Sequence, residues 1–266
     1  MDRYLEANQA LWDMKTPVHL ETPMYDMAGF RAGRCSLIPI EREALGDVRG
    51  KSLLHLQCHF GQDTLSWARL GAKCTGIDFS GEAIQTARSL NEELGLDATF
   101  VQSNIYDLPD NLDGQFDIVF TSYGVLSWLP DLEGWAQVVR HFLKPGGTFF
   151  IAELHPSLMT FEMEDGTIRY PYFNTGKPLE EAVTGTYADR NADIKSTAYF
   201  WFHSVSETLG PLLRRGLVLQ EFEEYDYFPW NCFPNMHERA PGEYVYGDFG
   251  VALPHMFTLK MEAPEG

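Results

Sequence analysis

Residues 57–61 and Asp78 have the types and the spacing of a site for an adenosine-containing cofactor. The turn 57–61 follows the apolar run 52–56 and precedes a stretch with helical spacing, so its backbone N–H groups can face a ligand at a helix start. Asp78 stands 21 positions after Gln57, and an acidic residue at about that distance can accept hydrogen bonds from ribose hydroxyls. This spacing alone fits a nicotinamide dinucleotide and S-adenosylmethionine equally well.

Short apolar strands that alternate with helices must position these residues. Between residues 50 and 155 the sequence predicts strands at 52–56, 73–77, 98–102, 116–121 and 148–152, with helices at 62–70, 80–94 and 131–143. This alternation is typical of βαβ units, and right-handed crossovers between them give a doubly wound α/β fold. Ligands of such folds bind beyond the carboxyl ends of the strands. A further helix at 206–215 and strands at 217–225 and 256–261 complete a Rossmann-like sheet.

Two segments fall outside this alternation. Residues 157–202 are too long for an ordinary connection and are predicted to form an inserted substrate cap, while residues 1–48 are predicted to form an N-terminal helical lid. Residues 49–156 and 203–262 would then form the cofactor-binding domain. The C-terminal residues 157–266 hold 19 of the 36 aromatic residues. These aromatic side chains either line an apolar pocket or pack into a small satellite core.

Several motifs in order resemble those of the class I S-adenosylmethionine-dependent methyltransferases. They are LLHLQCHFGQDTLSWARLGAKCTGIDFS at 53–80, SNIYDLP at 103–109, FDIVFTSYGVLSWLPDL at 116–132 and VVRHFLKPGGTFFIAE at 138–153. In particular the chain resembles an uncharacterised bacterial subgroup of the ubiquinone- and menaquinone-type methyltransferase domains, also at 12–25 and 227–236. The resemblance implies a seven-stranded sheet whose last strand is antiparallel, S-adenosylmethionine as cofactor and methyl transfer to a small molecule.

The resemblance also assigns residues to each part of the cofactor. The turn residues Gln57, Cys58, His59 and Gly61 would lie beside its methionine part, Asp78 would bind the ribose and Phe79 would pack on the adenine. The remaining cofactor residues would be Asn104 and Ile105 at the adenine edge and Ser122 near the sulfonium.

One departure from the family pattern concerns the turn itself. Gln57 and His59 stand where the family has glycine, and His55 stands at the usual acidic position of the first strand. Side chains in this turn crowd a close approach of the backbone to a ligand. Either the turn is rebuilt around the cofactor or the site has lost its function; the retained Gly61, Asp78 and Asn104 favour a rebuilt site.

Methyl transfer requires an acceptor held in line with the methyl group, at about 3 Å, and a base where the acceptor carries a proton. His155, at the end of the fifth strand, is the first candidate base and His203 is the second, with a structural role as the alternative for each. Tyr123 would lie beside the sulfonium and the acceptor. Candidates for the acceptor wall and the lid, with ordinary packing as the alternative, are Trp12, His19, Tyr25, Trp128, Tyr227 and Trp230.

The composition of the chain limits the classes of molecule that it is expected to bind. The chain carries 20 basic and 38 acidic residues, a net charge of −18, and shows no basic cluster, so nucleic acid is not expected as a partner. We find no apolar run of about 18 residues and no signal peptide, and the four cysteines form no CxxC pair. We therefore expect a cytoplasmic protein that binds neither a membrane nor a metal ion; the oligomeric state is not indicated.

Two other functions compete with this interpretation. A nicotinamide-dependent dehydrogenase would carry a GxGxxG turn, which the sequence lacks. A protein that keeps the fold and binds the small molecule or cofactor without turnover would explain the missing glycines.

Overall fold

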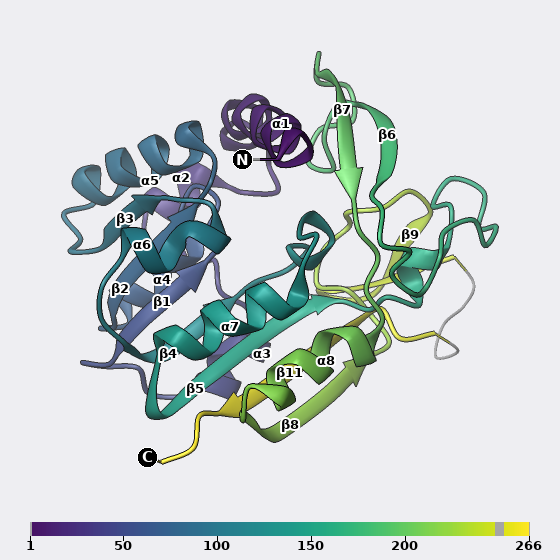
Figure 1. Ribbon diagram of the computed structural model, residues 1–266. Helices are drawn as coiled ribbons and strands as arrows, with labels where there is room; N and C mark the ends of the chain where they lie inside the picture. The colour runs from purple at the N-terminus through teal and green to yellow at the C-terminus, as the bar shows by residue number, and fades with distance from the viewer. Residues whose placement is uncertain (1, 248–252, 266) are drawn as a thin grey trace.

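The computed structural model describes residues 2–247 and 253–265. A seven-stranded sheet runs through its centre in the order β3-β2-β1-β4-β5-β11-β8 (Figure 1). Its strands are β1 (Ser52–Leu56), β2 (Lys73–Asp78), β3 (Thr99–Gln102), β4 (Phe116–Thr121), β5 (Leu143–Leu154), β8 (Val218–Tyr225) and β11 (Met256–Glu262). Neighbours among β1 to β5 are parallel, whereas β11 is antiparallel to both β5 and β8. The predicted Rossmann-like sheet with an antiparallel last strand is confirmed.

Helices connect these strands and begin where the sequence offers caps. The hydroxyl of Ser80 accepts the N–H of Ala83 at the start of α5, and Ser204 forms a capping box with Glu207 at the start of α8. The helices are α4 (Gln62–Arg69), α5 (Gly81–Glu93), α6 (Leu108–Asn111), α7 (Leu132–Phe142) and α8 (Val205–Arg214), with short 3₁₀ turns η1 (Ile105–Asp107), η2 (Leu126–Trp128) and η3 (Leu158–Thr160).

Strand β5 is longer than predicted. The Lys-Pro-Gly-Gly segment 144–147 was expected to be a turn before a strand at 148, but β5 begins at Leu143, which pairs with Phe116 of β4. A register irregularity between Phe116 and Ile118 absorbs the turn residues and lets the strand continue.

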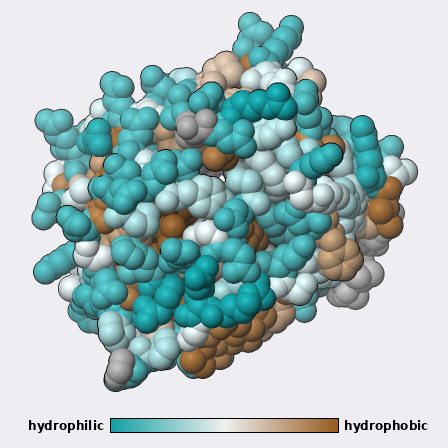
Figure 2. All heavy atoms as spheres, viewed as in Figure 1, coloured by the Kyte–Doolittle hydropathy of each residue, from teal (hydrophilic) through white to brown (hydrophobic). Residues whose placement is uncertain are grey.

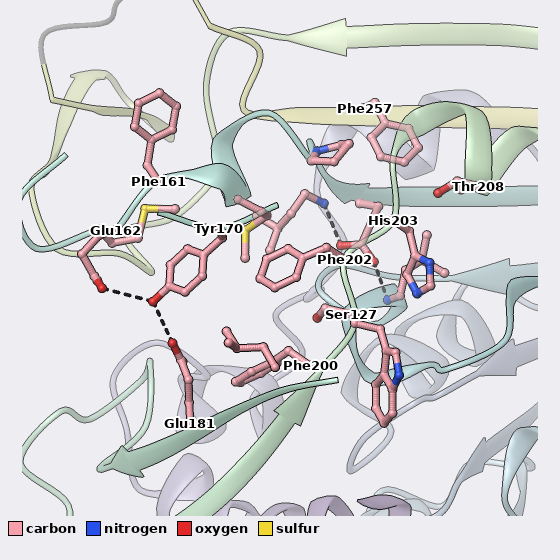
Figure 3. Close-up of a pocket in the computed structure, with 18 residues that line it drawn as sticks. Ser127, Phe161, Glu162, Tyr170, Glu181, Phe200, Phe202, His203, Thr208 and Phe257 are labelled. Atoms are coloured by element: carbon pink, nitrogen blue, oxygen red, sulfur yellow. Dashed lines mark hydrogen bonds between the residues drawn. The ribbon is translucent and has the colours of Figure 1, made fainter. Parts of the chain in front are cut away.

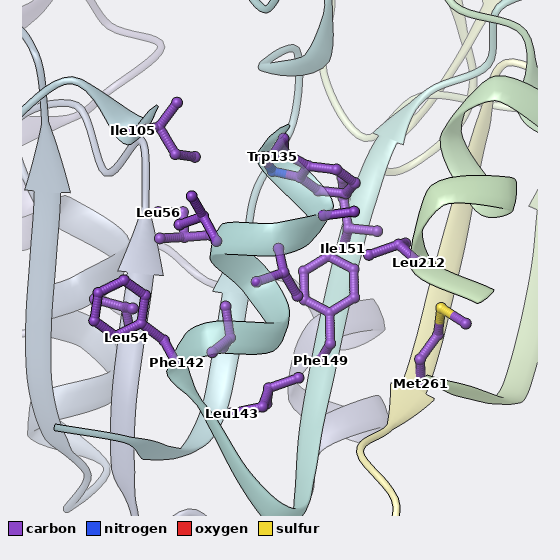
Figure 4. Packing of buried hydrophobic residues seen from close by; sticks show 14 of the residues in the cluster. Leu54, Leu56, Ile105, Trp135, Phe142, Leu143, Phe149, Ile151, Leu212 and Met261 are labelled. Atoms are coloured by element: carbon purple, nitrogen blue, oxygen red, sulfur yellow. The ribbon is translucent and has the colours of Figure 1, made fainter. Parts of the chain in front are cut away.

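The main hydrophobic core lies between the sheet and the helices α7 and α8. Trp135 and Phe142 of α7 and Leu212 of α8 are fully buried against Phe149 and Met261 of the sheet (Figure 4). Burying a side chain of this size contributes about 1.5–3 kcal/mol relative to leaving it exposed. This packing fixes the strands whose carboxyl ends carry the predicted site.

Two segments cover the carboxyl edge of the sheet, and they are joined to each other. The first contains the helices α1 (Arg3–Leu20), α2 (Met27–Arg31) and α3 (Pro39–Leu45), and the second contains the hairpin β6 (Leu179–Thr184) and β7 (Lys195–Phe200). Figure 1 shows α1 between α5 and β7. The buried side chain of Asn8 donates to the carbonyl of Tyr199 at 2.8 Å and accepts its N–H at 2.9 Å. We call these two segments, residues 2–48 and 157–202, the cover.

A second hairpin follows β8 and was missed by the sequence analysis. It consists of β9 (Met236–Ala240) and β10 (Glu243–Tyr246), which pair antiparallel. Buried Phe228 forms a bridge with Tyr244 and so fixes this hairpin to the segment 227–236.

The outer surface is mostly hydrophilic on the face that Figure 2 shows, and apolar side chains gather along its lower edge, near β8 (Figures 1 and 2). Exposed apolar residues at this edge strand and the preceding helix include Leu213, Val218 and Leu219. Within residues 2–247 and 253–265 no helix has the length and apolar character needed to cross a membrane.

Candidate active site

The turn after β1 keeps the backbone shape that favours glycine although two of its residues carry side chains. Gln57 and His59 have φ values of 55° and 51°. Such left-handed backbone costs about 1–2 kcal/mol for a residue with a Cβ. The side chains offset that cost with contacts, because Gln57 Nε2 donates to the carbonyl of Val125 at 3.2 Å and His59 Nε2 shares a 2.9 Å hydrogen bond with His19 Nδ1. In this structure the turn is tied to the loop after β4 and to the cover.

Gly61 ends the turn and cannot be replaced without a clash. Its φ is 78°, and a Cβ at this position would lie 2.6 Å from the ring of Phe100 and 3.0 Å from the Cβ of Ala87. The glycine therefore allows α4 to begin directly against β3 and α5. Buried Cys58 packs behind the turn, with Phe60, in the same apolar cluster as Phe100.

Asp78, at the end of β2, faces the turn. Its carboxylate accepts the N–H of His59 at 2.8 Å and the N–H of Ser80 at 2.9 Å. Burial raises the pKa of Asp78 from 3.8 to about 6, although both hydrogen bonds lower it. Each carboxylate oxygen keeps a second lone pair, so the group can still accept a hydrogen bond from a hydroxyl.

The residues predicted for the adenine lie beside β2 and β3. Phe79 is half-buried, and its carbonyl accepts a 2.6 Å hydrogen bond from Gln9 of α1. Asn104 caps η1 by accepting the N–H of Tyr106, and Ile105 is buried in the main core. These contacts hold both segments, and they place the Ile105 side chain in the core, so that its role at the adenine stays a prediction.

An aromatic cluster from the cover lies over the turn. The ring of His19 stacks on Tyr25 with a centroid separation of 5.2 Å, and Trp12 meets the ring of His59 at 5.2 Å. The hydroxyl of Tyr25 shares a short hydrogen bond with that of Tyr187, which comes from the second segment of the cover. Burial lowers the pKa of His19 to about 3 and that of His59 well below 6.5, so both rings are neutral.

Lys15 belongs to this cluster and was missed by the sequence analysis. It is 7% exposed, and its Nζ lies 4.7 Å from the ring centroid of Trp12 and 5.1 Å from that of Trp128. Burial lowers its pKa from 10.5 to about 8. The available signal was helical spacing, since Trp12, Lys15 and His19 stand at positions i, i+3 and i+7 of one helix face.

Unpaired polar groups show that this site suits the amino-acid part of S-adenosylmethionine. Gln57 Oε1 and His19 Nε2 are buried without a hydrogen-bond partner, and buried polar groups are rarely left so. Gln57 Oε1 can accept a hydrogen bond from an ammonium group. Together with Asp78 for the ribose, the described residues fit this cofactor.

Beyond the ends of β4 and β5 lies a cavity of about 230 Å³ (Figure 3). Its walls are mainly apolar and include the aromatic residues Phe161, Phe200, Trp201, Phe202 and Phe257. At one end the Tyr170 hydroxyl lies 2.7 Å from Glu181 Oε1 and 3.1 Å from Glu162 Oε2 (Figure 3). The cavity combines apolar walls with a polar end rich in hydrogen-bond acceptors.

Trp128 lies between the cofactor side and this cavity. Its ring is 5.3 Å from that of Trp12 and 4.7 Å from that of Phe200, a residue of the cavity wall. The adjacent Leu126 and Ser127 line the cavity directly. The loop 122–128 therefore separates the cofactor turn from the cavity and contacts both.

The two candidate histidines differ in position. His203 lines the cavity, and its Nε2 donates to the carbonyl of Leu129 at 2.8 Å while its Nδ1 lies 3.1 Å from Asn174 Nδ2. His155 is not among the described residues that line the cavity; its Nε2 lies 3.0 Å from Glu224 Oε1 on β8. Burial lowers the pKa of both rings. The catalytic role of either stays a prediction.

Tyr123 is held by a buried acid. Its hydroxyl donates to Glu41 Oε2 at 2.9 Å, and its ring meets Trp230 at 4.8 Å. Burial raises the pKa of Glu41 to about 8, so this carboxyl binds a proton easily near neutral pH. Tyr227 lies elsewhere, against Tyr225 at the end of β8.

Ser122 contacts His55 and not an acid. Its hydroxyl lies 3.2 Å from His55 Nε2, and His55 Nδ1 is 2.8 Å from the hydroxyl of Thr64. Burial lowers the pKa of His55 to about 3, which keeps the ring neutral. His55 thus contacts two hydroxyl groups at the position where the resembled family has an acidic residue.

Comparisons with known proteins agree with this geometry. Residues 54–149 match the family model of a methyltransferase domain. The ubiquinone biosynthesis O-methyltransferase of Xanthomonas euvesicatoria pv. vesicatoria is 24% identical over 249 residues, which cover 92% of this chain and 91% of that enzyme. The enzyme of the same description from Erwinia tasmaniensis is 34% identical over 106 residues, or 40% of this chain and 43% of that one.

Solved structures show the same fold. The crystal structure of an S-adenosylmethionine dependent methyltransferase from Mesorhizobium loti superposes with a TM-score of 0.55 at 17% identity, covering 87% of this chain and 99% of that one. The sheet order, the retained Gly61 and Asp78 and the sequence matches all lead to one family. Residues 54–149 form a methyltransferase domain, and these findings together support a class I S-adenosylmethionine-dependent methyltransferase.

Proposed function

We propose that the protein methylates a small molecule whose body occupies the aromatic cavity beneath the cover. The observation that carries this proposal is the shared loop 122–128. Val125 of this loop accepts a hydrogen bond from Gln57 of the cofactor turn, and the next two residues, Leu126 and Ser127, line the cavity. One loop therefore contacts both reactants, as in-line transfer requires.

The cavity supports an acceptor with an apolar body and a hydrogen-bond donor. Aromatic walls favour apolar or aromatic groups. Glu162 and Glu181 offer carboxylate oxygens, which only accept hydrogen bonds, so they favour an amine or hydroxyl group on the acceptor. A net charge of −18 disfavours nucleic acid as the acceptor. We propose that the acceptor is a metabolite of the cytoplasm.

The cofactor supplies an activated methyl group, and the residues of this chain hold, orient and enclose the reactants. The acceptor loses its proton when the new bond forms, and His203, which lines the cavity, is placed to receive it. His203 Nδ1 can do so once it is released from Asn174. Tyr123 can pass its own proton to Glu41 as it takes one from the acceptor only above about pH 8, where Glu41 is ionised, and it is not among the described residues that line the cavity. We therefore expect His203, and neither Tyr123 nor His155, to serve acceptors that need a base.

A substitution that fills the cavity tests this proposal. Leu179→Trp places a larger side chain on the cavity wall, whereas Leu213→Trp adds the same group at the exposed end of α8. Transfer is followed by S-adenosylhomocysteine formation with a library of small amines and phenols.

We expect turnover of at least one acceptor by the natural chain and by Leu213→Trp. Leu179→Trp should lose that turnover while it binds S-adenosylhomocysteine as before in calorimetry. Equal turnover in both variants would show that the acceptor binds elsewhere.

A further inference from the structure

Lys15 is a buried cation without a counter-charge. Among residues 2–247 and 253–265 no carboxylate forms an ion pair with it, and its Nζ makes no hydrogen bond with a described residue. Its contacts are the faces of Trp12 and Trp128. Lys144 and Lys260, by contrast, each form an ion pair, with Asp117 and Glu221.

Aromatic faces do not compensate for this burial. Each ring contact offsets only part of the free energy that burying an ion costs, and Lys15 has two such contacts. Buried charges in proteins are therefore paired or bound to a ligand. An anion bound from outside would supply the partner that Lys15 lacks among the described residues.

The surroundings of Lys15 place this anion beside the turn after β1. Lys15 Nζ lies over Trp12, whose ring is 5.2 Å from that of His59, and, after burial, the charge of Lys15 also lowers the pKa of His19 and His59. Gln57, two residues before His59, has the unpaired carbonyl oxygen Oε1. The turn thus offers an acceptor without a described partner, and Lys15 of the helix that contacts the turn offers a cation, a pair of groups that matches a zwitterionic amino acid.

We propose that Lys15 binds the carboxylate of the methionine part of the cofactor, so that the N-terminal segment of the cover selects cofactors that carry this group. The proposal rests on the proposed function, because it requires the cofactor to lie at the turn. Helix α1 has two further contacts with this edge, from Gln9 to the Phe79 carbonyl and from Asp13 to the Ser80 hydroxyl. Binding of the carboxylate therefore fixes a helix that already lies over the predicted adenosine residues.

Two nucleosides distinguish the contact between Lys15 and the carboxylate from the contacts with the adenosine. S-Adenosylhomocysteine and 5′-methylthioadenosine share the adenosine and the thioether, but only the first has the amino-acid carboxylate. Calorimetry gives the affinity of each for the natural chain, Lys15→Met and Lys15→Arg. Lys73→Met is the matched control, because Lys73 is exposed at the start of β2.

Lys15→Met should weaken S-adenosylhomocysteine binding by about tenfold to a hundredfold, the range for a lost hydrogen bond to a charged group. Binding of 5′-methylthioadenosine should change by less than about twofold, because it never contacts the ammonium. Lys15→Arg and Lys73→Met should keep the natural preference for S-adenosylhomocysteine.

The stability of the free protein gives a second readout. Removal of an unpaired buried charge should raise the thermal midpoint of Lys15→Met by at least about 2 °C without any ligand. A lysine that only supports the fold would lower this midpoint instead.

Three results would overturn the proposal. The first is an unchanged affinity of Lys15→Met for S-adenosylhomocysteine. The second is an equal loss of affinity for both nucleosides, which would show that the substitution disturbs the cover as a whole. A lower midpoint together with an unchanged preference would assign Lys15 to the fold. If the natural chain bound neither nucleoside, the proposed function would fail first, and this inference with it.

Discussion

The cofactor edge of the sheet and the cover above it differ in how their polar groups are satisfied. At the edge, both oxygens of Asp78 accept backbone N–H groups, and the carboxylate of Glu153 accepts four, from Gly124, Val125, Leu126 and Leu154. In the cover, no described residue forms an ion pair with Lys15 or a hydrogen bond with His19 Nε2. The carboxylates of the edge are hydrogen-bonded without a ligand, whereas Lys15 of the cover has no anion among the described residues; the amide oxygen Gln57 Oε1 of the turn is also unpaired there. This difference supports the proposal that the cover responds to a bound anion.

The largest expected effect concerns the edge. Gly61→Ala should destabilise the protein by about 3–5 kcal/mol, because its Cβ would lie 2.6 Å from the Phe100 ring at a φ of 78°. Gly95→Ala is the control: its φ is 61°, but nothing lies within 4 Å of the new Cβ, so about 1 kcal/mol should be lost. Urea unfolding compares the two, and equal losses would mean that the close approach at Gly61 is unimportant.

Within the cover, the junction between its two segments should matter next. Asn8→Ala removes two hydrogen bonds to the backbone of Tyr199 and leaves both of those groups unpaired, at a cost of about 2–3 kcal/mol. Gln9→Ala removes one bond from a half-buried side chain and should cost about 1 kcal/mol. Chemical unfolding measures both. A smaller loss for Asn8→Ala than for Gln9→Ala would show that the two segments are not one unit.

The missing anion should also show as a pH dependence. Lys15 has a folded pKa of about 8 against 10.5 unfolded, so below pH 8 the free energy of unfolding is reduced by about 3 kcal/mol. Between pH 8 and 10.5 Lys15 is protonated in the unfolded chain but largely neutral in the folded chain. The free energy of unfolding of the natural chain therefore rises with pH relative to that of Lys15→Met. The neighbouring His19 and His59 stay neutral in this window. A constant difference between the two proteins from pH 7 to 10 would exclude an unpaired ammonium.

The smallest effect is expected at the rebuilt turn. His59→Gly relieves a φ of 51° but loses the hydrogen bond to His19, so the two changes should cancel to within about 1 kcal/mol. Differential scanning calorimetry with and without S-adenosylhomocysteine measures the balance. A gain well above 1 kcal/mol would mean that the histidine is retained at the expense of stability and not as a neutral replacement.

The edge could be predicted from the sequence because its determinants are local. The apolar runs, the Ser80 cap and the spacing from Gln57 to Asp78 are all read within about 30 residues, and parallel strands then bring their carboxyl ends together. The family resemblance added the direction of the last strand. The shape of the turn was not visible, because two non-glycine residues adopt the left-handed backbone there.

The cover could be predicted only in outline, because its contacts join distant positions. Asn8 meets Tyr199 and Tyr25 meets Tyr187, and neither pair has a periodic signal in the sequence. Trp12, His19 and Tyr25 were predicted as lid residues, but Lys15, on the same helix face as Trp12 and His19, was not singled out. Its burial depends on Trp128, which is more than a hundred residues away.

The central claim is that the cover responds to the carboxylate of the cofactor, and amide hydrogen exchange tests it most directly. Exchange is followed in α1 and β7 for the free protein, with S-adenosylhomocysteine and with 5′-methylthioadenosine, each at saturation. We predict slower exchange in both elements with S-adenosylhomocysteine and little change with 5′-methylthioadenosine, while β1 and β2 exchange alike with either. Equal protection of α1 by both nucleosides would contradict the account, because the cover would then respond to the adenosine alone.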